Sequence, residues 1–171
     1  VQDIQMPVGG VADQILVKEG DQVKAGQVLM KLDTEASEEK RNSLEKTIKL
    51  KKEQLVLKDE EKRNYMQVNQ EEVLMLESNL ELQAEILGRL EQLEEAGAYS
   101  EVQILNQQNT VAEIRGKLMQ SKAERLRQVA QLDQQTAQLK SELADLNGRL
   151  VETKVTLRYQ QLKSPVDGVV F

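Results

Sequence analysis

The chain lacks cysteine, histidine and tryptophan altogether, and aromatic residues make up only 2% of its 171 residues. Without cysteine and histidine it can form no disulfide, no zinc site of the usual kinds and no imidazole acid–base pair. Most classes of enzyme are therefore excluded, and we expect a protein that is not an enzyme and holds no metal. The abundance of Leu, Glu, Gln, Lys and Ala is typical of long helices rather than of a thick globular core.

Positive charge is also in short supply, because 23 Lys and Arg face 29 Asp and Glu, for a formal net charge of -6. An acidic surface repels phosphate backbones and anionic lipid headgroups, so we expect no nucleic-acid partner. No apolar run approaches the roughly 20 residues that span a bilayer, and no signal peptide opens the chain. Since the chain begins at Val1 without Met and stops at Phe171 inside a predicted strand, we expect it to be a fragment.

Proline and glycine are concentrated at the two ends of the chain. Between Leu32 and Leu162 there is no proline, and only four of the nine glycines occur there. This interval of about 130 residues permits helix throughout. Residues 7–33 contain short aliphatic and β-branched runs separated by EGD and AGQ turns, which predicts strands. The final KSPVDGVVF repeats the PVGGV that opens this segment, so one small β domain split by an insertion is predicted.

Within the insertion, apolar residues recur at steps of three and four, the spacing of a coiled-coil seam. In the second half, ten of the fourteen seam positions from 111 to 157 are apolar, and Lys122 is one of the exceptions. The first half carries a seam at Val73, Leu76, Leu80, Leu87 and Leu90. Between residues 58 and 72 the seam nearly vanishes, so this stretch is a candidate hinge or helix break.

The predicted turn between the two helical arms lies near residues 94–100. Gly97 suits a left-handed C-terminal cap, and Ser100 with Gln103 forms a capping box for the next helix. Folding the chain here pairs residues whose numbers add up to about 195, so Asp33 lies opposite Leu162. A symmetric hairpin of about 62 residues per arm and roughly 90 Å follows.

The ends of the chain resemble the lipoyl or biotinyl carrier fold. EGDQV at 19–23 and GQVL at 26–29 stand where a half-repeat of that fold has its EGD and GQ turns. Ala36 occupies the position of the carrier lysine on the next turn, and Lys31 lies five residues earlier, within a predicted strand. We therefore expect no covalently bound cofactor, and a true carrier domain of a biotin or lipoate enzyme is a rival interpretation.

A lipoyl-like domain split at that turn by a helical hairpin resembles the periplasmic adaptor subunits, or membrane fusion proteins, of the haemolysin-D-like family. The resemblance rests on EGDQVKAGQVLMKLD, the hairpin and LKSPVDGVV together, and covers the whole chain. It implies a mainly α fold, a long antiparallel two-helix coiled coil inserted into an incomplete lipoyl-like domain. The implied parts are a first lipoyl-like half at 1–33, a hairpin at 34–162 with arms 35–96 and 99–161 and tip 96–100, and the start of the second half at 163–171.

The hairpin tip is similar to the tip motif of that family, an Arg, a Leu four residues later and a Ser seven after that. Here these are Arg89, Leu93 and Ser100. The resemblance implies that they dock on the periplasmic end of a TolC-type outer-membrane channel. Without it, they are a surface arginine, an ordinary apolar residue and a helix cap.

Leu82 and Ile86 lie beside the main seam of the first arm and widen its apolar face beyond what one partner helix covers. Two interpretations stay open. The residues make lateral contacts with neighbouring hairpins or channel helices, or they overpack against Val102 and Leu105 within the hairpin.

The resemblance further implies a periplasmic location, with an anchor in the inner membrane outside this segment, and a homo-oligomer of six copies. These would bridge an inner-membrane transporter, preferably of the ABC type, to the channel. The long arms favour type I protein secretion over the nearest alternative, a multidrug or small-molecule efflux pump. A cytoplasmic coiled-coil interaction arm is a more distant alternative. Coiled-coil arms that bind RNA would need a basic helix face, which the overall acidity of this chain does not favour.

Overall fold

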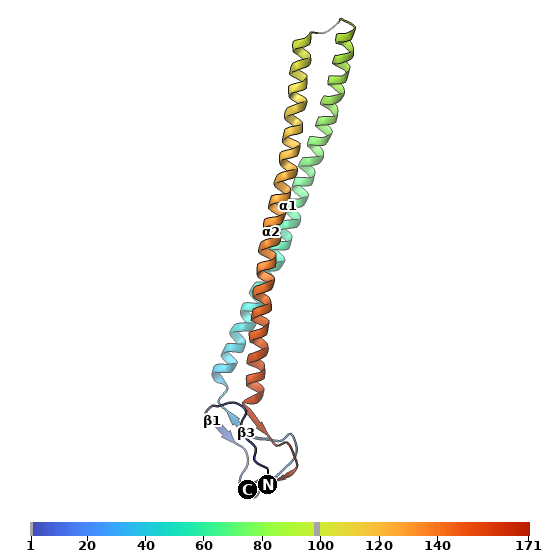
Figure 1. Ribbon diagram of the computed structural model, residues 1–171. Coiled ribbons are helices and arrows are strands. Elements are labelled where there is room, and N and C mark those ends of the chain that lie inside the picture. Colours follow the sequence, from blue (N-terminus) through green and yellow to red (C-terminus); the bar gives the residue numbers. More distant parts are fainter. Residues whose placement is uncertain (1, 98–99) are drawn as a thin grey trace. The chain divides into compact units, whose positions relative to one another are not determined.

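The computed structural model describes residues 2–97 and 100–171. Two long helices, α1 (Glu35–Glu95) and α2 (Glu101–Tyr159), lie in sequence between short strands from the two ends of the chain (Figure 1). The predicted mainly α fold with a helical hairpin is thereby confirmed. The chain divides into two compact units, residues 1–54 with 139–171 (unit 1) and residues 55–138 (unit 2). The predicted domain boundaries at 33 and 163 stay a prediction.

In unit 1 the two ends of the chain build one small β structure. The central strand β3 (Val28–Leu32) pairs antiparallel with β1 (Ala12–Ile15) and with β4 (Gln161–Lys163), which follows the insertion. A second antiparallel pair joins β2 (Gln22–Val23) to β5 (Gly168–Val169). Each pairing across the insertion joins residues more than 100 positions apart, so the β structure requires both ends of the chain.

The AGQ turn and the final segment hold one another in place. Gly26 has a φ of 82°, a conformation that glycine adopts at little cost. Its N–H donates to the carbonyl of Ser164 at 2.7 Å, and the N–H of Ala25 donates to the Asp167 carboxylate at 2.7 Å. Ser164 is buried, and its hydroxyl donates to the carbonyl of Val166 at 2.6 Å. Ser164 and Asp167 thus serve the β structure.

The hairpin leaves the sheet through very short connections. Asp33 and Thr34 alone separate β3 from α1, and Gln160 alone separates α2 from β4. The Asp33 carboxylate accepts a hydrogen bond from the N–H of Glu35 at 3.0 Å, and the side-chain amide of Gln160 donates to the Asp33 carbonyl at 3.3 Å. Ala36, at the position of the carrier lysine, lies in the first turn of α1. Both helices are therefore tied to the sheet at one point.

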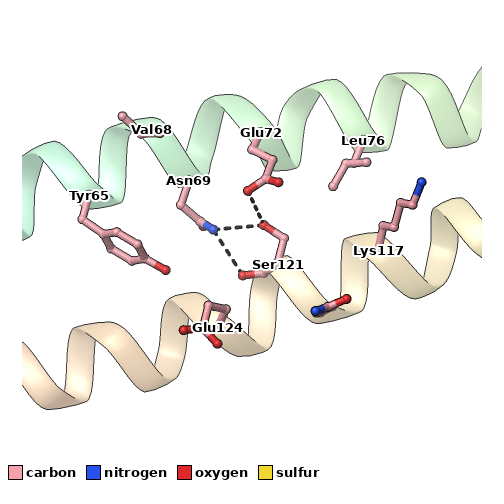
Figure 2. Close-up of a pocket in the computed structure, with 9 residues that line it drawn as sticks. Tyr65, Val68, Asn69, Glu72, Leu76, Lys117, Ser121 and Glu124 are labelled. Carbon is pink, nitrogen blue, oxygen red and sulfur yellow. Dashed lines mark hydrogen bonds between the residues drawn. The ribbon is translucent and has the colours of Figure 1, made fainter.

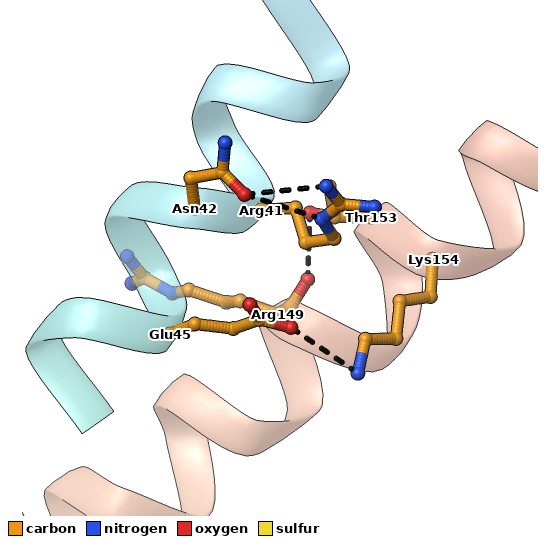
Figure 3. A network of polar contacts seen from close by, with 6 residues as sticks. All are labelled: Arg41, Asn42, Glu45, Arg149, Thr153 and Lys154. Atoms are coloured by element: carbon orange, nitrogen blue, oxygen red, sulfur yellow. Dashed lines mark hydrogen bonds and ion pairs between the residues drawn. The ribbon is translucent and has the colours of Figure 1, made fainter. Parts of the chain in front are cut away.

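The seam of unit 1 is partly polar. Ile48 and Leu143 are buried, and so is Thr153, whose hydroxyl donates to the Arg149 carbonyl at 2.9 Å (Figure 3). Figure 3 also shows the pairing of Lys154 on α2 with Glu45 on α1, at 3.5 Å. Such exposed ion pairs contribute about 0–1 kcal/mol, so burial of the seam carries more of the stability.

The helix break considered for residues 58–72 is wrong, because α1 is continuous from Glu35 to Glu95. Polar contacts across unit 2 replace the missing apolar ones: Lys62 pairs with Asp133 at 2.6 Å, and Arg125 donates to Gln70 at 2.8 Å. The numbers of each pair add up to 195, the sum predicted from the position of the turn. Good helix formers on both sides of the stretch and these cross-helix bonds keep the helix intact.

The seam of α2 passes through Ser121 rather than through the predicted Lys122. Ser121 is buried between Leu118 and Arg125, whereas Lys122 is exposed and pairs with Glu77 at 2.7 Å. From Leu118 to Arg125, a step of three residues followed by a step of four reaches Ser121 and keeps the seam on one line. The predicted step of four followed by three reaches Lys122, which lies further from α1. A serine is also cheaper to bury than a lysine.

Leu132, only 2% exposed, is the position where a truncation should cost most in unit 2. We expect Leu132→Ala to lower the free energy of unfolding by about 2–5 kcal/mol, because it removes buried methyl groups and leaves a cavity. Leu126→Ala is the matched control, since Leu126 is 75% exposed; its effect should stay within about 0.5 kcal/mol. Urea unfolding followed by circular dichroism measures both, and equal losses would contradict this description of the seam.

Candidate functional site

The turn of the hairpin begins with a glycine cap. α1 ends at Glu95, and Gly97 follows with a φ of 72° and an N–H that donates to the carbonyl of Glu94 at 2.7 Å. A side chain at this φ would be strained, so the predicted left-handed glycine cap is confirmed. Positions 98 and 99 of the predicted tip lie outside the described residues.

Ser100 directly precedes α2, and it does not form the predicted capping box. Its carbonyl accepts the first helical hydrogen bonds, from the N–H groups of Gln103 at 3.1 Å and Ile104 at 3.4 Å. Its hydroxyl donates to the Gln103 side-chain carbonyl at 3.1 Å, whereas in a capping box it would accept from the Gln103 N–H. The pair of residues is the predicted one, and the atoms that bond differ.

All three predicted docking residues have exposed side chains. Arg89 pairs with Glu85 one helical turn earlier, and both side chains are more than half exposed. Leu93 is 45% exposed, and since it follows Arg89 by four residues the two share a helix face. Ser100 is exposed at the start of α2. The structure thus presents a cation, an apolar side chain and a hydroxyl to solvent around the turn, and their docking role stays a prediction.

Leu82 and Ile86 are 54% and 36% exposed, and Val102 and Leu105 are exposed as well. The overpacking interpretation is therefore wrong, because neither side of the proposed contact is buried. These side chains are left open on the outside of both helices.

A buried polar layer crosses unit 2, and the sequence analysis missed it (Figure 2). The side-chain amide of Asn69, 5% exposed, donates to the hydroxyl of Ser121 at 3.0 Å and to its carbonyl at 3.2 Å. The Ser121 hydroxyl in turn donates to the Glu72 carboxylate at 3.0 Å. An asparagine at a seam position between Leu55 and Val73 was the available signal.

A groove of about 420 Å³ borders this layer, and Tyr65, Leu76, Lys117 and Glu124 are among its lining residues. The side-chain oxygen of Asn69 is buried there without a hydrogen-bond partner. A single buried asparagine in a coiled coil fixes the pairing of its helices at a cost in stability. The Asn69–Ser121 layer is therefore suited to fixing which residues of α1 and α2 lie opposite one another.

Among the described residues, no group of three or more carboxylate, histidine or cysteine side chains could hold a metal ion. Within the same residues, neither long helix has an apolar window that would suffice to cross a membrane.

Replacing Asn69 tests the cost of the layer. We expect Asn69→Leu to raise the free energy of unfolding by about 1–3 kcal/mol, because it removes a buried carbonyl without a partner. Asn79→Leu, at an exposed position of α1, is the control and should have little effect. Urea unfolding compares the two variants, and a less stable Asn69→Leu would mean that the bonds to Ser121 contribute net stability.

No family model matches the chain, and no curated protein matches it. Among solved structures it is similar to the periplasmic adaptor protein EmrA, with 18% identity and a TM-score of 0.53 over 97% of this chain and 64% of that chain. Two weaker similarities are to the soluble domain of LipC, a membrane fusion protein of a type I secretion system (16% identity, TM-score 0.47, 99% and 91% covered), and to MacA from Actinobacillus actinomycetemcomitans (18%, 0.49, 100% and 42%).

The chain thus spans less than two thirds of the length of EmrA. At this identity the similarity shows the fold, in which a long helical hairpin is joined to a few β-strands. The predicted resemblance to the periplasmic adaptors is confirmed at that level.

Proposed function

We propose that this chain is the hairpin-bearing part of a periplasmic adaptor that bridges an inner-membrane transporter to a TolC-type outer-membrane channel. The observation that carries the proposal is the insertion of a two-helix hairpin into a β structure made from both ends of the chain, the fold shared with the adaptor EmrA. We further propose six copies around the channel axis and an anchor in the inner membrane outside this segment.

The length of the helices supports protein export by a type I system with an ABC-type transporter. α1 has 61 residues and α2 has 59, and in this proposal the adaptor itself crosses much of the periplasm. An adaptor of that kind has to hold its two partners in position, and it does not catalyse a reaction. The short connections at Asp33–Thr34 and Gln160 suit this task, because they leave little freedom where the helices leave the sheet.

The tip residues have the chemistry that a docking surface needs. Leu93 offers an exposed apolar side chain, and the guanidinium of Arg89 offers several hydrogen-bond donors in a fixed planar arrangement. The only ion pair of Arg89 among the described residues is with Glu85 on the surface, which contributes about 0–1 kcal/mol. Arg89 can therefore turn to a carboxylate or carbonyl of the channel at little cost.

A photo-crosslinking residue at Leu93 of the full-length protein tests docking directly. In the source cells we expect irradiation to give an adduct with an outer-membrane channel, identified by mass spectrometry. The same residue at Leu74 is the control, because Leu74 is also exposed and lies more than five turns from the turn of the hairpin. A cytoplasmic protein in the Leu93 adduct would contradict the proposal.

Removing the Arg89 side chain tests its part in docking. Because the truncation of an interface arginine often costs 1–2 kcal/mol, we expect Arg89→Ala to weaken binding to the channel about tenfold, with little change in the melting temperature. Arg149→Ala is the control. It removes the exposed ion pair between Arg149 and Asp145, which is comparable to that of Arg89 but lies away from the turn. Affinity measured on purified channel should not change for this control. Equal losses for both variants would make Arg89 a structural residue only.

A further inference from the structure

A second polar layer crosses unit 2, nearer to the turn of the hairpin. The side-chain amide of Gln107 on α2 donates to the backbone carbonyl of Gln83 on α1 at 2.9 Å and to its side-chain oxygen at 2.8 Å. Both glutamines are half-buried. In the first layer, the amide of Asn69 likewise donates to a backbone carbonyl and a side-chain oxygen, both of Ser121. The two layers are therefore alike, with the donor on α1 in one and on α2 in the other.

The two polar layers are spaced by two heptads on both helices. Asn69 and Gln83 are 14 residues apart on α1, and Gln107 and Ser121 are 14 residues apart on α2. The numbers of the bonded residues add up to 190 in both layers. The two layers therefore belong to one register of the helices.

An apolar layer lies midway between the polar ones. By the same sum, Leu76 on α1 is level with Ile114 on α2, which is buried. Figure 2 shows Leu76 on the side of α1 that faces α2. One heptad beyond Gln83, α1 continues with the half-buried Leu90. Polar and apolar side chains thus alternate at every heptad in what we call the alternating row, which consists of Asn69, Leu76, Gln83 and Leu90 on α1 and of Gln107, Ile114 and Ser121 on α2.

The other row of the seam has no such alternation. By nearly the same sum, its layers in this part of unit 2 are apolar on both helices: Val73 with Leu118, Leu80 with Val111, and Leu87 with Ile104. An offset of seven residues would again place apolar residues opposite one another in two of these layers. Burial of this uniform row therefore discriminates poorly between the observed register and one shifted by a heptad.

In the alternating row, the same offset opposes unlike side chains. A shift in one direction places Gln107 level with Leu90, and a shift in the other direction places it level with Leu76. In both cases the amide of Gln107 loses the two oxygens of Gln83 that it bonds in the observed register. Ile114 then lies opposite a polar residue of α1, so a second polar group loses its partner. Polar groups that are shielded from water without a partner are unfavourable, so both shifted registers are penalised.

A shifted register would also misplace both ends of the hairpin. A slide of seven residues amounts to about 10 Å at 1.5 Å per residue. It would move the turn by three or four residues, so that Gly97, with its φ of 72°, would no longer lie at the end of α1. In unit 1, only Asp33–Thr34 and Gln160 connect the helices to β3 and β4. Two extended residues span at most about 7 Å, so these connections cannot absorb the slide and β3 could not pair with β4.

The part of the hairpin near the turn can form before the β structure does. Gln83 and Gln107 are 24 residues apart in the sequence, whereas Met30 and Leu162, which face one another in β3 and β4, are more than 130 apart. Closing the shorter loop costs less conformational entropy, and contacts between residues close in sequence form faster. The register is therefore chosen near the turn before the strands can meet.

We propose that the alternating row selects the register in which the hairpin closes, and so decides that Gly97 caps α1 and that β3 meets β4. Gln83 and Gln107 are positioning residues in this respect, because they form their bonds in one register only. The inference does not depend on the proposed adaptor function. It accounts for polar residues in the seam near the turn, where leucine would bury more apolar surface.

An exchange of two residues of α2 reverses the pattern without changing the composition. In Gln107→Ile with Ile114→Gln, the observed register places Gln83 opposite an isoleucine and Leu76 opposite a glutamine. A shift of seven residues instead pairs Gln83 with the introduced amide. We expect this full-length variant to refold through a shifted hairpin, with an additional phase at least about tenfold slower than the refolding of the unaltered chain. Stopped-flow circular dichroism measures the phases.

A compensating exchange on α1 restores the pattern. Leu76→Gln with Gln83→Leu, added to the exchange on α2, moves the second polar layer one heptad away from the turn on both helices. The slow phase should then disappear. Val111→Leu with Leu118→Val is the control, because it exchanges two buried residues of the same spacing in the uniform row. It should add no slow phase.

Spin labels report the register directly, since the chain has no cysteine of its own. Labels at Ser78→Cys and Ala137→Cys, both exposed positions of unit 2, lie about 30 Å apart along the hairpin in the observed register. When the variant with the exchange on α2 is frozen early in refolding, we expect a second distance about 10 Å shorter, because the shift brings the labelled positions closer in height. The compensated variant should show the longer distance only.

A single substitution gives the answer if the exchanged variant does not refold. Gln107→Leu removes the amide that distinguishes the registers, so we expect both distances early in refolding. Gln108→Leu, at the exposed neighbouring position, should show the longer distance only.

Two outcomes would overturn the inference. Refolding of the exchanged variant in one phase and with one distance would mean that the alternating row does not select the register. A slow phase with the longer distance alone would mean a weakened seam without a shifted register. Neither readout involves the channel, so the result is independent of the adduct at Leu93.

Discussion

The antiparallel pairing of β3 with β4 is the constraint on which the other features depend. It places Met30 opposite Leu162 and so brings together two segments that are separated by more than 120 residues, most of them helical. Once the strands are paired, the chain must leave the sheet through α1 and return to it through α2. The two helices therefore start side by side at the sheet and run antiparallel. Bringing the two strands together costs conformational entropy, because it closes a long loop of the chain. The ordered helical hairpin forms that loop and offsets this entropy cost.

Helix pairing in unit 2 shows how a coiled coil tolerates a weak stretch of seam. Where apolar residues are missing from α1, the seam is occupied by Lys62, Tyr65 and Asn69, and polar bonds to α2 take the place of apolar contact. An exposed ion pair adds little stability, but a buried asparagine penalises other pairings of the helices. The stretch thus gives up stability for a defined pairing, which suits a hairpin whose turn must present particular residues.

The outside of the hairpin differs from that of an ordinary surface helix. Scattered exposed apolar residues are normal, but several of those of α1 in unit 2, among them Met75, Leu82 and Leu93, recur on one face of the helix. Side chains at the turn have a separate chemistry, with a cation, a leucine and a hydroxyl exposed around Gly97. The proposed adaptor function thus divides the hairpin into a seam for folding and a turn for the channel.

Local rules of the sequence were enough for the two helices, the glycine cap at Gly97 and the strands at both ends, because periodicity, turn residues and backbone preferences act over a few residues. The sequence also predicted which residues of the two helices lie at the same height, namely those whose numbers add up to about 195. This follows from the position of the single turn between the helices. Only the tertiary structure decided that α1 continues through 58–72, that Ser121 rather than Lys122 is buried, and that Leu82 and Ile86 stay exposed. These outcomes depend on which side chain of the facing helix lies at the same height, and no rule that considers one helix at a time contains that information.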